Sequence, residues 1–194
     1  MSWISDSELE AIGFRSIGSN VLIDSSVVIH NAQHISLGSS IRIDAFAILL
    51  AGQEGLIIGN HVHIAPGSRI SGTSARVSFG DFSGVSGGVA IYTATDDYRH
   101  GHLTNPTVPA EYRSLRVGSI ALEKHAIVGA NSVLLPGVVL GLGSSVGALT
   151  LVNSSVPAGA IVSGNPMRKL GERDVGNLWK LEEQLLAGAE IAGD

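Results

Sequence analysis

Five side chains that can take part in acid–base chemistry lie within seven residues of the chain: Asp96, Asp97, Tyr98, His100 and His102. The unperturbed pKa of histidine, about 6.5, lies near neutrality, so an imidazole can accept a proton from a reacting group. A carboxylate beside it can hold the ring in one tautomer. We therefore expect a general base here, His102 or His100, supported by Asp96 and Asp97. The alternative is that both histidines are ordinary residues of an exposed loop.

The segment that carries these residues interrupts a six-residue repeat that runs from residue 17 to residue 157. The first position of each repeat is apolar, the fifth is small or β-branched, and Gly often stands second, as at Gly18, Gly80 and Gly129. A strand that turns at fixed intervals fits this pattern, whereas a helix of 3.6 residues per turn does not. Glycine suits a tight bend where a Cβ would collide. The repeat predicts an all-β chain wound as a β-solenoid.

Interruptions of the repeat follow every third hexad. The coils then begin at Ile17, Leu37, Ile58, Phe79, Leu122 and Leu140. Three hexads to a coil predict a triangular cross-section, with all insertions leaving from one corner. Insertions on one edge of a repeat protein usually build its binding face. We therefore expect function in the longest insertion, the loop of residues 92–119.

Short helical pieces are expected on both sides of the solenoid. Residues 1–16 predict an N-terminal helical cap, in which Ser5 and Glu8 form a capping box and Gly13 ends the helix. Residues 17–171 form the β-helix domain. Residues 172–194 predict a C-terminal helix and tail, with one apolar stripe packed against the last coil or a neighbouring subunit. The stripe consists of Val175, Leu178, Leu181 and Leu185.

Composition excludes several classes of protein. The formal net charge of −5 argues against a nucleic-acid binder, which would need a basic stripe. The chain has no Cys, which removes disulfides, thiolate metal sites and a cysteine nucleophile and fits a reducing compartment. Residues 1–10 do not resemble a signal peptide, and no apolar run approaches the ~18 residues of a membrane span. We expect a cytoplasmic domain without a nucleic-acid partner and without a membrane span.

Two segments of the chain resemble a known family. The run LEKHAIVGANSVLLPGVVLGLGSSVGALTLV at residues 122–152, followed by VSGNPMRKL at residues 162–170, is similar to the hexapeptide-repeat acyltransferases. Within them it resembles the galactoside, maltose and polysaccharide O-acetyltransferases. The resemblance implies a left-handed parallel β-helix, a homotrimer, acetyl-CoA as the donor, and an active site in the groove between neighbouring prisms.

The resemblance also implies positions for the cofactor. Small residues that let the pantetheine arm approach the backbone match at Gly129, Ala130, Ser132, Gly147 and Ala148. The motif that receives the nucleotide end of coenzyme A matches at Gly164, Asn165, Pro166 and Arg168, with Lys169 as a second cation for its phosphates. Leu149 departs from the family pattern, where Gly is common, and Met167 stands where Ala is common. The alternative for Gly129 and Gly147 is that they serve only the corners of the coils.

The family's usual base is the His of a His-Pro pair in the long loop, and this chain has no such pair. Alignment from the left puts Asp96 at that position, and alignment back from Pro106 puts Asn105 there. On the coils, His61, Phe82 and His125 share one position in their hexads, so we expect them to form a column on the outer surface. The column serves either packing between subunits or, together with Tyr98 of the loop, binding of the acceptor. His30, His34 and His63 carry no functional hypothesis.

The leading expectation is therefore an acetyltransferase that acts on a saccharide hydroxyl in cell-surface polysaccharide assembly. The alternative is N-acetylation of a nucleotide-linked amino sugar, because an amine needs less help from a base than a hydroxyl does. A metalloenzyme resembling γ-class carbonic anhydrase is remote. That fold would need two coil histidines five residues apart, whereas His61 and His63 are two apart, and we expect no metal. A non-catalytic scaffold is also remote, because it leaves Arg168, Lys169 and the charged loop without a purpose.

Overall fold

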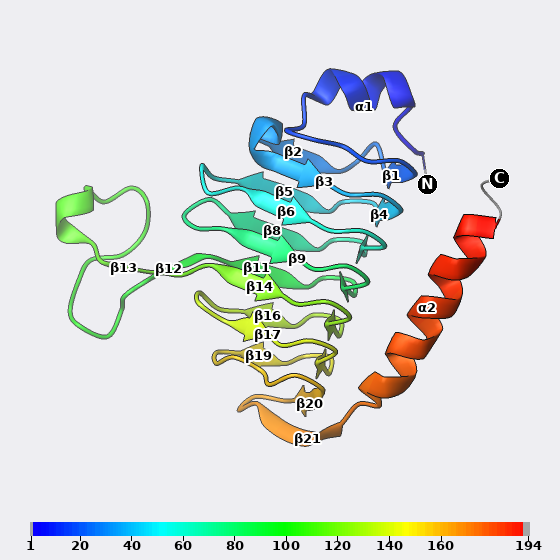
Figure 1. Cartoon of the computed structure of the whole chain (residues 1–194). Coiled ribbons are helices and arrows are strands. Elements are labelled where there is room, and N and C mark those ends of the chain that lie inside the picture. The colour runs from blue at the N-terminus through cyan, green and yellow to red at the C-terminus, as the bar shows by residue number, and fades with distance from the viewer. Residues whose placement is uncertain (1, 192–194) are drawn as a thin grey trace.

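The structure is a computed structural model that describes residues 2–191, and it shows a triangular β-solenoid of parallel strands (Figure 1). The first face consists of β1 Val21–Ile23, β4 Ile41–Ile43, β7 His63–Ile64, β10 Gly84–Val85, β15 Ile127–Val128, β18 Ser145–Val146, β20 Ala160–Ser163 and the antiparallel β21 Arg168–Glu172. The second face consists of β2 Val28–His30, β5 Ile48–Ala51, β8 Arg69–Gly72, β11 Ala90–Tyr92, β16 Val133–Leu134 and β19 Leu151–Val152. The third face consists of β3 Ile35–Leu37, β6 Leu56–Ile58, β9 Val77–Phe79, β14 Ile120–Leu122 and β17 Val139–Leu140.

The register of the third face confirms the predicted coils. Leu37 pairs with Ile58, Ile58 with Phe79, Phe79 with Leu122, and Leu122 with Leu140. Equivalent apolar residues therefore stack one above another inside the prism, and the five just named are between 0% and 3% exposed. Burial of such columns drives the winding of the chain, since a single coil cannot cover its own inward face.

The glycines of the repeat are needed because the backbone of the neighbouring coil lies very close to them. A Cβ on Gly80 would lie 2.6 Å from the backbone nitrogen of Lys124, one coil further on. Gly80 itself does not have a positive φ. The left-handed conformation falls two residues later, at Phe82 (φ 58°), and His61 (φ 55°) and His125 (φ 61°) adopt it at the same corner of their coils. Close stacking of backbones, as well as the turn itself, therefore requires the glycine.

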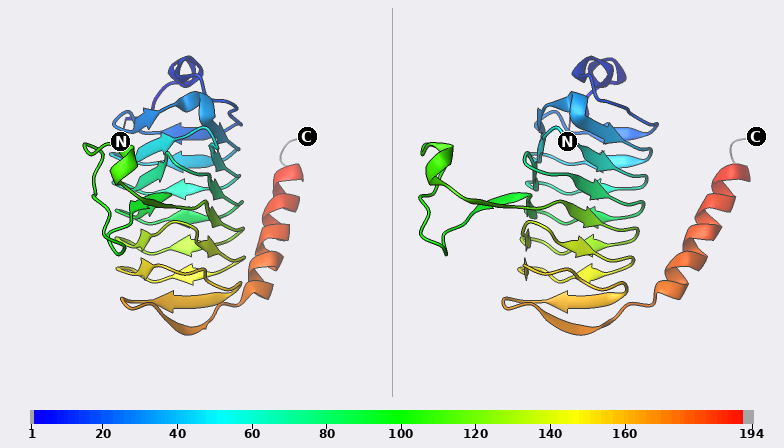
Figure 2. Two further views of the ribbon diagram at one scale, coloured as in Figure 1. Left: turned by 90° about the vertical axis from the view of Figure 1, so that its left-hand side faces the viewer. Right: turned by 60° about the vertical axis from the view of Figure 1, so that its left-hand side comes forward.

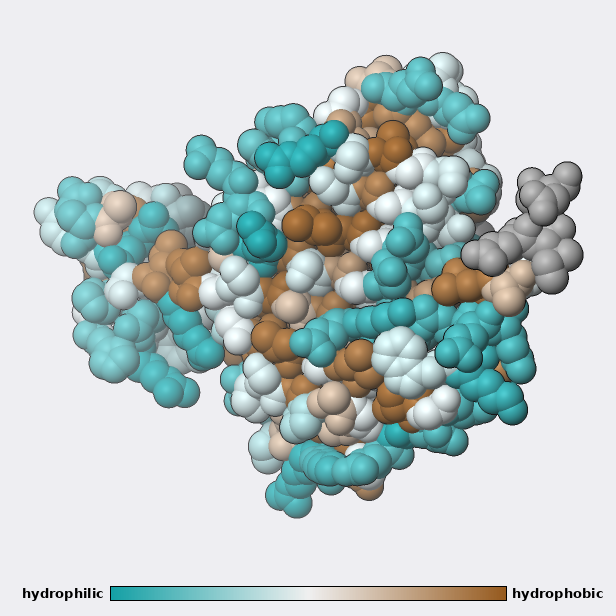
Figure 3. All heavy atoms as spheres, in the orientation of Figure 1, coloured by the Kyte–Doolittle hydropathy of each residue, from teal (hydrophilic) through white to brown (hydrophobic). Residues whose placement is uncertain are grey.

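The insertions leave from the corner between the second and third faces, as predicted. The first includes η1, Ala32–His34, and the longest extends far from the prism (Figure 2). Its base is an antiparallel ribbon of β12 Ala94–Asp96 and β13 Leu115–Val117, and its outer part holds η2, Ala110–Tyr112. We call residues 94–117 the arm. The arm is mostly hydrophilic, with an apolar patch toward its base (Figure 3).

Helices flank the solenoid at both ends. The helix α1, Asp6–Ile12, has the predicted capping box of Ser5 and Glu8 and ends at Gly13 in the left-handed conformation. At the other end β21 occupies the residues up to Glu172, and α2, Val175–Ile191, begins after it. The expected apolar stripe of α2 packs on the solenoid only in part. Val175 approaches Gly143 and Gly159, whereas Leu181 and Leu185 are each 52% exposed. No helix within residues 2–191 has the length and apolar character needed to cross a bilayer.

Candidate active site

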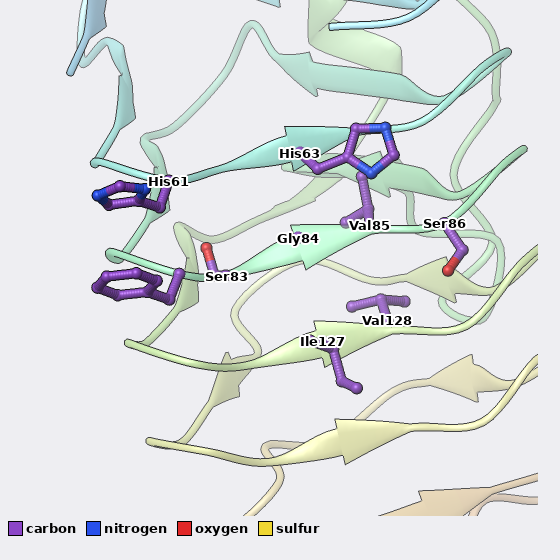
Figure 4. Close-up of a pocket in the computed structure, with 9 residues that line it drawn as sticks. His61, His63, Ser83, Gly84, Val85, Ser86, Ile127 and Val128 are labelled. Carbon is purple, nitrogen blue, oxygen red and sulfur yellow. The ribbon is translucent and has the colours of Figure 1, made fainter. Parts of the chain in front are cut away.

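An open groove of about 310 Å³ lies on the first face, across β7, β10 and β15 (Figure 4). His63, Gly84 and Ile127 occupy equivalent positions on these three strands. Because Gly84 has no side chain, the outer surface is hollow between the imidazole above it and the isoleucine below it. Phe82 and Ser86 complete two edges of the groove.

A buried carboxylate holds two basic side chains beside this groove. Asp44 follows β4, and its side chain is 4% exposed. One carboxylate oxygen accepts a hydrogen bond from Nε of Arg42 at 2.7 Å, and the other lies 2.7 Å from Nε2 of His63. The side chain of His63 is 51% exposed and lines the groove. The cluster thus joins a fixed interior anion to an imidazole that solvent or a ligand can reach.

The charge of Asp44 follows from these contacts. Burial would raise the pKa of its carboxyl group, but the hydrogen bonds and charges of Arg42 and His63 outweigh burial and hold the pKa below its usual value. Asp44 is therefore an anion at neutral pH. An anionic acceptor at Nε2 favours the tautomer of neutral His63 that carries its proton on that nitrogen.

Two serines in the groove have different environments. Ser83 is buried, and its hydroxyl donates a hydrogen bond to the carbonyl of Gly80 at 2.6 Å. Ser86 is exposed where β10 ends, its backbone N–H donates to the carbonyl of Val128, and within residues 2–191 its hydroxyl has no hydrogen-bond partner. The hydroxyl of Ser86 is thus available to a ligand.

The predicted aromatic column exists at the corner between the third and first faces. The rings of His61 and Phe82 stack at 4.5 Å between centroids, and those of Phe82 and His125 stack at 5.1 Å. The column ends under α2, where Trp179 meets the ring of His125 edge-on at 5.6 Å. Of the two histidines expected to contact an acceptor, the structure leaves His61 at the groove and covers His125.

His125 is tied to α2 by a buried hydrogen bond. Its Nε2 lies 2.8 Å from Oε2 of Glu182, and the two side chains are 7% and 9% exposed. Lys124 pairs with the other oxygen of Glu182, and its ammonium lies 4.8 Å from the ring centre of Trp179. At this end of the column, His125 therefore contacts the chain's own helix.

The arm carries the five side chains expected to do acid–base chemistry. Asp96 and Asn105, the two alternatives for the family's base position, are neighbours, since the N–H of Asn105 donates to Oδ2 of Asp96 at 3.3 Å. The other oxygen of Asp96, Oδ1, is buried and has no hydrogen-bond partner within residues 2–191. Tyr98 is 73% exposed, and His102 is also exposed.

His100 and Asp97 form a pair on the arm. Nδ1 of His100 lies 2.6 Å from Oδ2 of Asp97, and the side chain of His100 is 74% exposed. The hydrogen bond from His100 and that from the backbone of Arg99 lower the pKa of Asp97. The expected support of a histidine by a carboxylate is thus present, although His102 makes no such contact within the described residues.

The arm and the groove lie on opposite sides of one prism. The arm leaves the corner between the second and third faces, and in a triangle this corner is opposite the first face (Figures 1 and 2). Residues such as Asp96 and His102 therefore cannot meet His61 or His63 within one chain. Only the arm of another copy could bring both sets together.

Most residues expected to bind the cofactor gather on one edge. Gly129 and Ala130 follow β15, and Gly147 and Ala148 follow β18, so both pairs lie at the corner between the first and second faces. Ser86 lies at the same corner one coil earlier, since Val85 pairs with Val128. The exception is Ser132, which is fully buried, and its hydroxyl donates to the carbonyl of Gly147 at 3.0 Å.

The terminal motif continues this edge. Residues 164–167 form the turn between β20 and β21, and the N–H of Gly164 donates to the hydroxyl of Thr150 at 3.0 Å. Arg168 is exposed at the start of β21 and makes no ion pair within the described residues. Lys169 pairs with Glu172 at 2.7 Å. Leu149 adopts φ 57° at this corner, a left-handed conformation that Gly adopts more readily than a residue with a Cβ.

Sequence reasoning missed the cluster of Asp44, Arg42 and His63, although the repeat contained a signal for it. Arg42, His63 and Gly84 each stand directly before the first position of a hexad, so the register alone places them in one outward column. Within the described part of the chain, no group of three or more His, Cys, Asp or Glu side chains is arranged to hold a metal ion.

Comparison with known proteins gives strong matches over nearly the whole chain, although no protein-family model matches it. The chain is 34% identical over 173 residues to a dTDP-4-amino-4,6-dideoxy-D-glucose acyltransferase of Escherichia coli, which covers 89% of this chain and 90% of that protein. It superposes with a TM-score of 0.93 and 37% identity on AntD, an N-acyltransferase from Bacillus cereus, in a complex with dTDP and 3-hydroxybutyryl-CoA, covering 97% of this chain and 98% of AntD.

A more distant structure shares the fold alone. A maltose O-acetyltransferase from Clostridium difficile matches with a TM-score of 0.55 and 17% identity, over 87% of this chain and 74% of that one. The hexad repeat, the three-faced solenoid and the near-complete similarity to the Escherichia coli acyltransferase agree. The chain belongs to the hexapeptide-repeat acyltransferases.

Proposed function

We propose that this acyltransferase moves an acyl group from a coenzyme A thioester to the amine of a nucleotide-linked amino sugar. The observation that carries the proposal is the similarity over nine tenths of the chain to an enzyme named for such a sugar, together with AntD, which has been solved with dTDP-4-amino-4,6-dideoxyglucose and coenzyme A. The O-acetyltransferase match supports only the fold. The comparisons thus favour the alternative acceptor, the amine, over the saccharide hydroxyl.

The proposed donor site is the edge between the first and second faces. The neighbouring coils stack closely along it, since a Cβ on Gly147 would lie 2.5 Å from the hydroxyl of Ser163. Small residues on this edge leave the backbone open to a pantetheine arm, and Arg168 at its end has a guanidinium suited to phosphate. Acetyl-CoA is the expected donor. Because AntD binds 3-hydroxybutyryl-CoA, longer acyl groups belong in the test.

We further propose that the active enzyme is a homotrimer in which the arm of one subunit closes the groove of the next. AntD variants have been solved with substitutions at a serine and at an aspartate ten residues further along that chain. Ser86 and Asp96 have the same separation here, and the superposition covers 97% of this chain and 100% of AntD. Ser86 lies at the groove and Asp96 on the arm, so the two can share a site only between subunits. A cytoplasmic location fits both proposed substrates.

The function is tested with purified protein, two donors and two acceptors. The donors are acetyl-CoA and 3-hydroxybutyryl-CoA, and the acceptors are dTDP-4-amino-4,6-dideoxyglucose and its counterpart with a hydroxyl at the same carbon. Release of the coenzyme A thiol gives the rate, and mass spectrometry identifies the acylated sugar. Mild base separates the two products, because an ester is hydrolysed and an amide survives. We expect thiol release with the amine and only the background rate with the hydroxyl.

A faster rate with the hydroxyl sugar and a base-labile product would contradict the proposed amine acceptor and show that the acceptor is a hydroxyl. Transfer to neither sugar, with acetyl-CoA still raising the melting temperature, would leave an acyltransferase with a different acceptor.

A further inference from the structure

The imidazole of His63 lines the groove. His63 stands over Gly84, and Figure 4 shows its ring with one nitrogen turned toward β10 of the next coil. The other nitrogen, Nε2, is occupied by Asp44 at 2.7 Å. The nitrogen that faces the groove is therefore Nδ1.

The backbone and both carboxylate oxygens of Asp44, the residue that holds this ring, make hydrogen bonds. The N–H of Asp44 donates to the carbonyl of Ile64 at 2.9 Å, Nε of Arg42 donates to its Oδ1, and His63 occupies its Oδ2. An ionised and immobile acceptor at Nε2 leaves the lone pair of the neutral imidazole on Nδ1. That is the arrangement of a carboxylate-oriented base directed into an open site.

Nδ1 of His63 faces open space in the groove, and the groove leads toward the edge proposed for coenzyme A. Gly84 contributes no side chain beneath the ring, and Ser86, two residues further on the same strand, begins the edge proposed for coenzyme A. A thioester lying along that edge would present its carbonyl near Ser86, at the end of the groove that His63 lines. An amine in the groove would then lie between the imidazole and the thioester.

We propose that His63 is the catalytic base of the acyl transfer and that Asp44 is its positioning residue. The neutral amine attacks the thioester carbonyl and forms the C–N bond. His63 takes one proton from the attacking nitrogen on Nδ1, the intermediate collapses with cleavage of the C–S bond, and the imidazolium returns the proton to the thiolate of coenzyme A. The products are the amide and the free thiol, and the base is regenerated. This assignment rests on the proposed amine acceptor.

The charged and titratable groups that face His63 are few. Among residues 2–191 of one chain, Arg42 on β4 and Asp44 just after it face the ring, His61 precedes it on its own coil, and the next coil contributes Gly84 and the hydroxyl of Ser86. Replacing Asp44 by Asn removes the anion that fixes the tautomer and orientation of the ring, so kcat should fall while the KM values for both substrates stay close to wild type.

The test compares the variants His63→Gln and Asp44→Asn with wild type. Glutamine keeps an amide donor for Asp44 but has no basic nitrogen. For the amine acceptor we expect His63→Gln to lower kcat by about 10²-fold, with the KM values for both substrates within about threefold. Asp44→Asn should lower kcat by less than His63→Gln does, again with little change in either KM, because the base is still present but no longer held by an anion. The matched control is His30→Gln, an exposed histidine on β2 of the second face, which should leave kcat and both KM values unchanged.

Two results would overturn the assignment. A kcat of His63→Gln within about twofold of wild type would show that His63 is not the base, and a raised KM for the nucleotide sugar alone would make it an anion-binding residue. Thermal melting of His63→Gln shows whether the variant is folded, and its half-exposed side chain makes folding the expected result. If wild type itself does not acylate the amine, the proposed function fails before any variant is needed.

Discussion

At the scale of single residues, burial distinguishes side chains that are held in a fixed position from side chains that are exposed to solvent. Asp44 is almost fully buried and fixes the orientation of its partner, whereas His100 and Tyr98 are about three quarters exposed. A base needs a fixed position relative to the reacting atoms. The groove provides such a position within one chain, and the arm would need a neighbouring subunit to provide it.

The arm histidines give a direct prediction for the amine acceptor. His102→Asn and His100→Asn should each lower kcat by less than about tenfold, because an amine depends less on a base than a hydroxyl does and neither ring is held in the groove. Steady-state rates with the amino sugar between pH 6 and 9 measure this effect. Asp97→Asn serves as the companion variant, since it removes the partner of His100. A loss of 10²-fold or more in His102→Asn would return the role of base to the arm.

Arg168 gives a prediction for the donor. Arg168→Ala should raise the KM for acetyl-CoA by about ten- to a hundredfold with kcat little changed, because a charge-assisted hydrogen bond to a remote phosphate contributes ~1.5 to 3 kcal/mol to uniform binding. Lys169→Ala is the matched comparison, and its effect should be smaller, since Lys169 already pairs with Glu172. An unchanged KM in Arg168→Ala would place the nucleotide of coenzyme A elsewhere.

At the scale of elements, α2 is attached through one ionic cluster and a short apolar contact. Glu182 lies between Lys124 and His125, and Val175 packs beside Gly143. Burial alone would raise the pKa of Glu182, but the hydrogen bonds and charges of Lys124 and His125 hold it below the usual value. A carboxyl group whose pKa is lowered by folding stabilises the folded state above its unfolded pKa of about 4.3, and this contribution is lost as the pH falls through the folded pKa.

Glu182→Gln should therefore lower the free energy of unfolding at neutral pH by roughly 1 to 3 kcal/mol and reduce the loss of stability between about pH 5 and pH 2. Urea titrations at several pH values measure both effects. The fluorescence of Trp179, recorded in a Trp3→Phe background, reports whether α2 has left the coils. Glu183→Gln, one residue further on an exposed side of the helix, is the control. Equal acid sensitivity in both variants would show that the cluster does not anchor α2.

At the scale of the whole molecule, the prism presents an open groove on one face and an arm at the opposite corner (Figure 1). The strand β13 at the base of the arm exposes Leu115 and Val117 at 45% and 48%. Such apolar surface on an extended ribbon is costly unless another chain covers it. A closed ring of three copies would cover it and bring each arm to a neighbour's groove.

Subunit complementation tests this assembly. One variant carries His63→Gln, and a second replaces residues 97–114 of the arm by a short Gly-Ser link that leaves the ribbon of β12 and β13 in place. Each should be inactive or nearly so alone, and sedimentation should show trimers for wild type. Co-expression should restore about a quarter of the wild-type rate per site, because random mixing gives that fraction of sites an intact groove and an intact arm. No recovery in trimers that mass spectrometry shows to be mixed would place arm and groove in separate functions.

Much of the architecture was predictable from sequence because the repeat is local and strictly periodic. The coil starts at Leu37, Ile58, Phe79, Leu122 and Leu140, the single corner of insertions, and the cap of Ser5 and Glu8 all follow from spacing along the chain. The column of His61, Phe82 and His125 was predictable for the same reason, since residues at equivalent hexad positions must stack.

The contacts that depend on side-chain direction and on packing between distant elements needed the tertiary structure. Sequence reasoning gave His63 no role, because only the folded coils show that Asp44, 19 residues earlier, occupies one of its nitrogens and that Gly84 leaves the space beneath it. It left His125 open between subunit packing and acceptor binding, because nothing in the repeat reveals that Glu182, 57 residues later, returns to cover it. Hexad spacing by itself determined the prism, the corners and the arm. The tertiary structure decided which polar side chains are held, which are covered and which remain open to a substrate, because burial and hydrogen bonding depend on neighbours that are distant in sequence.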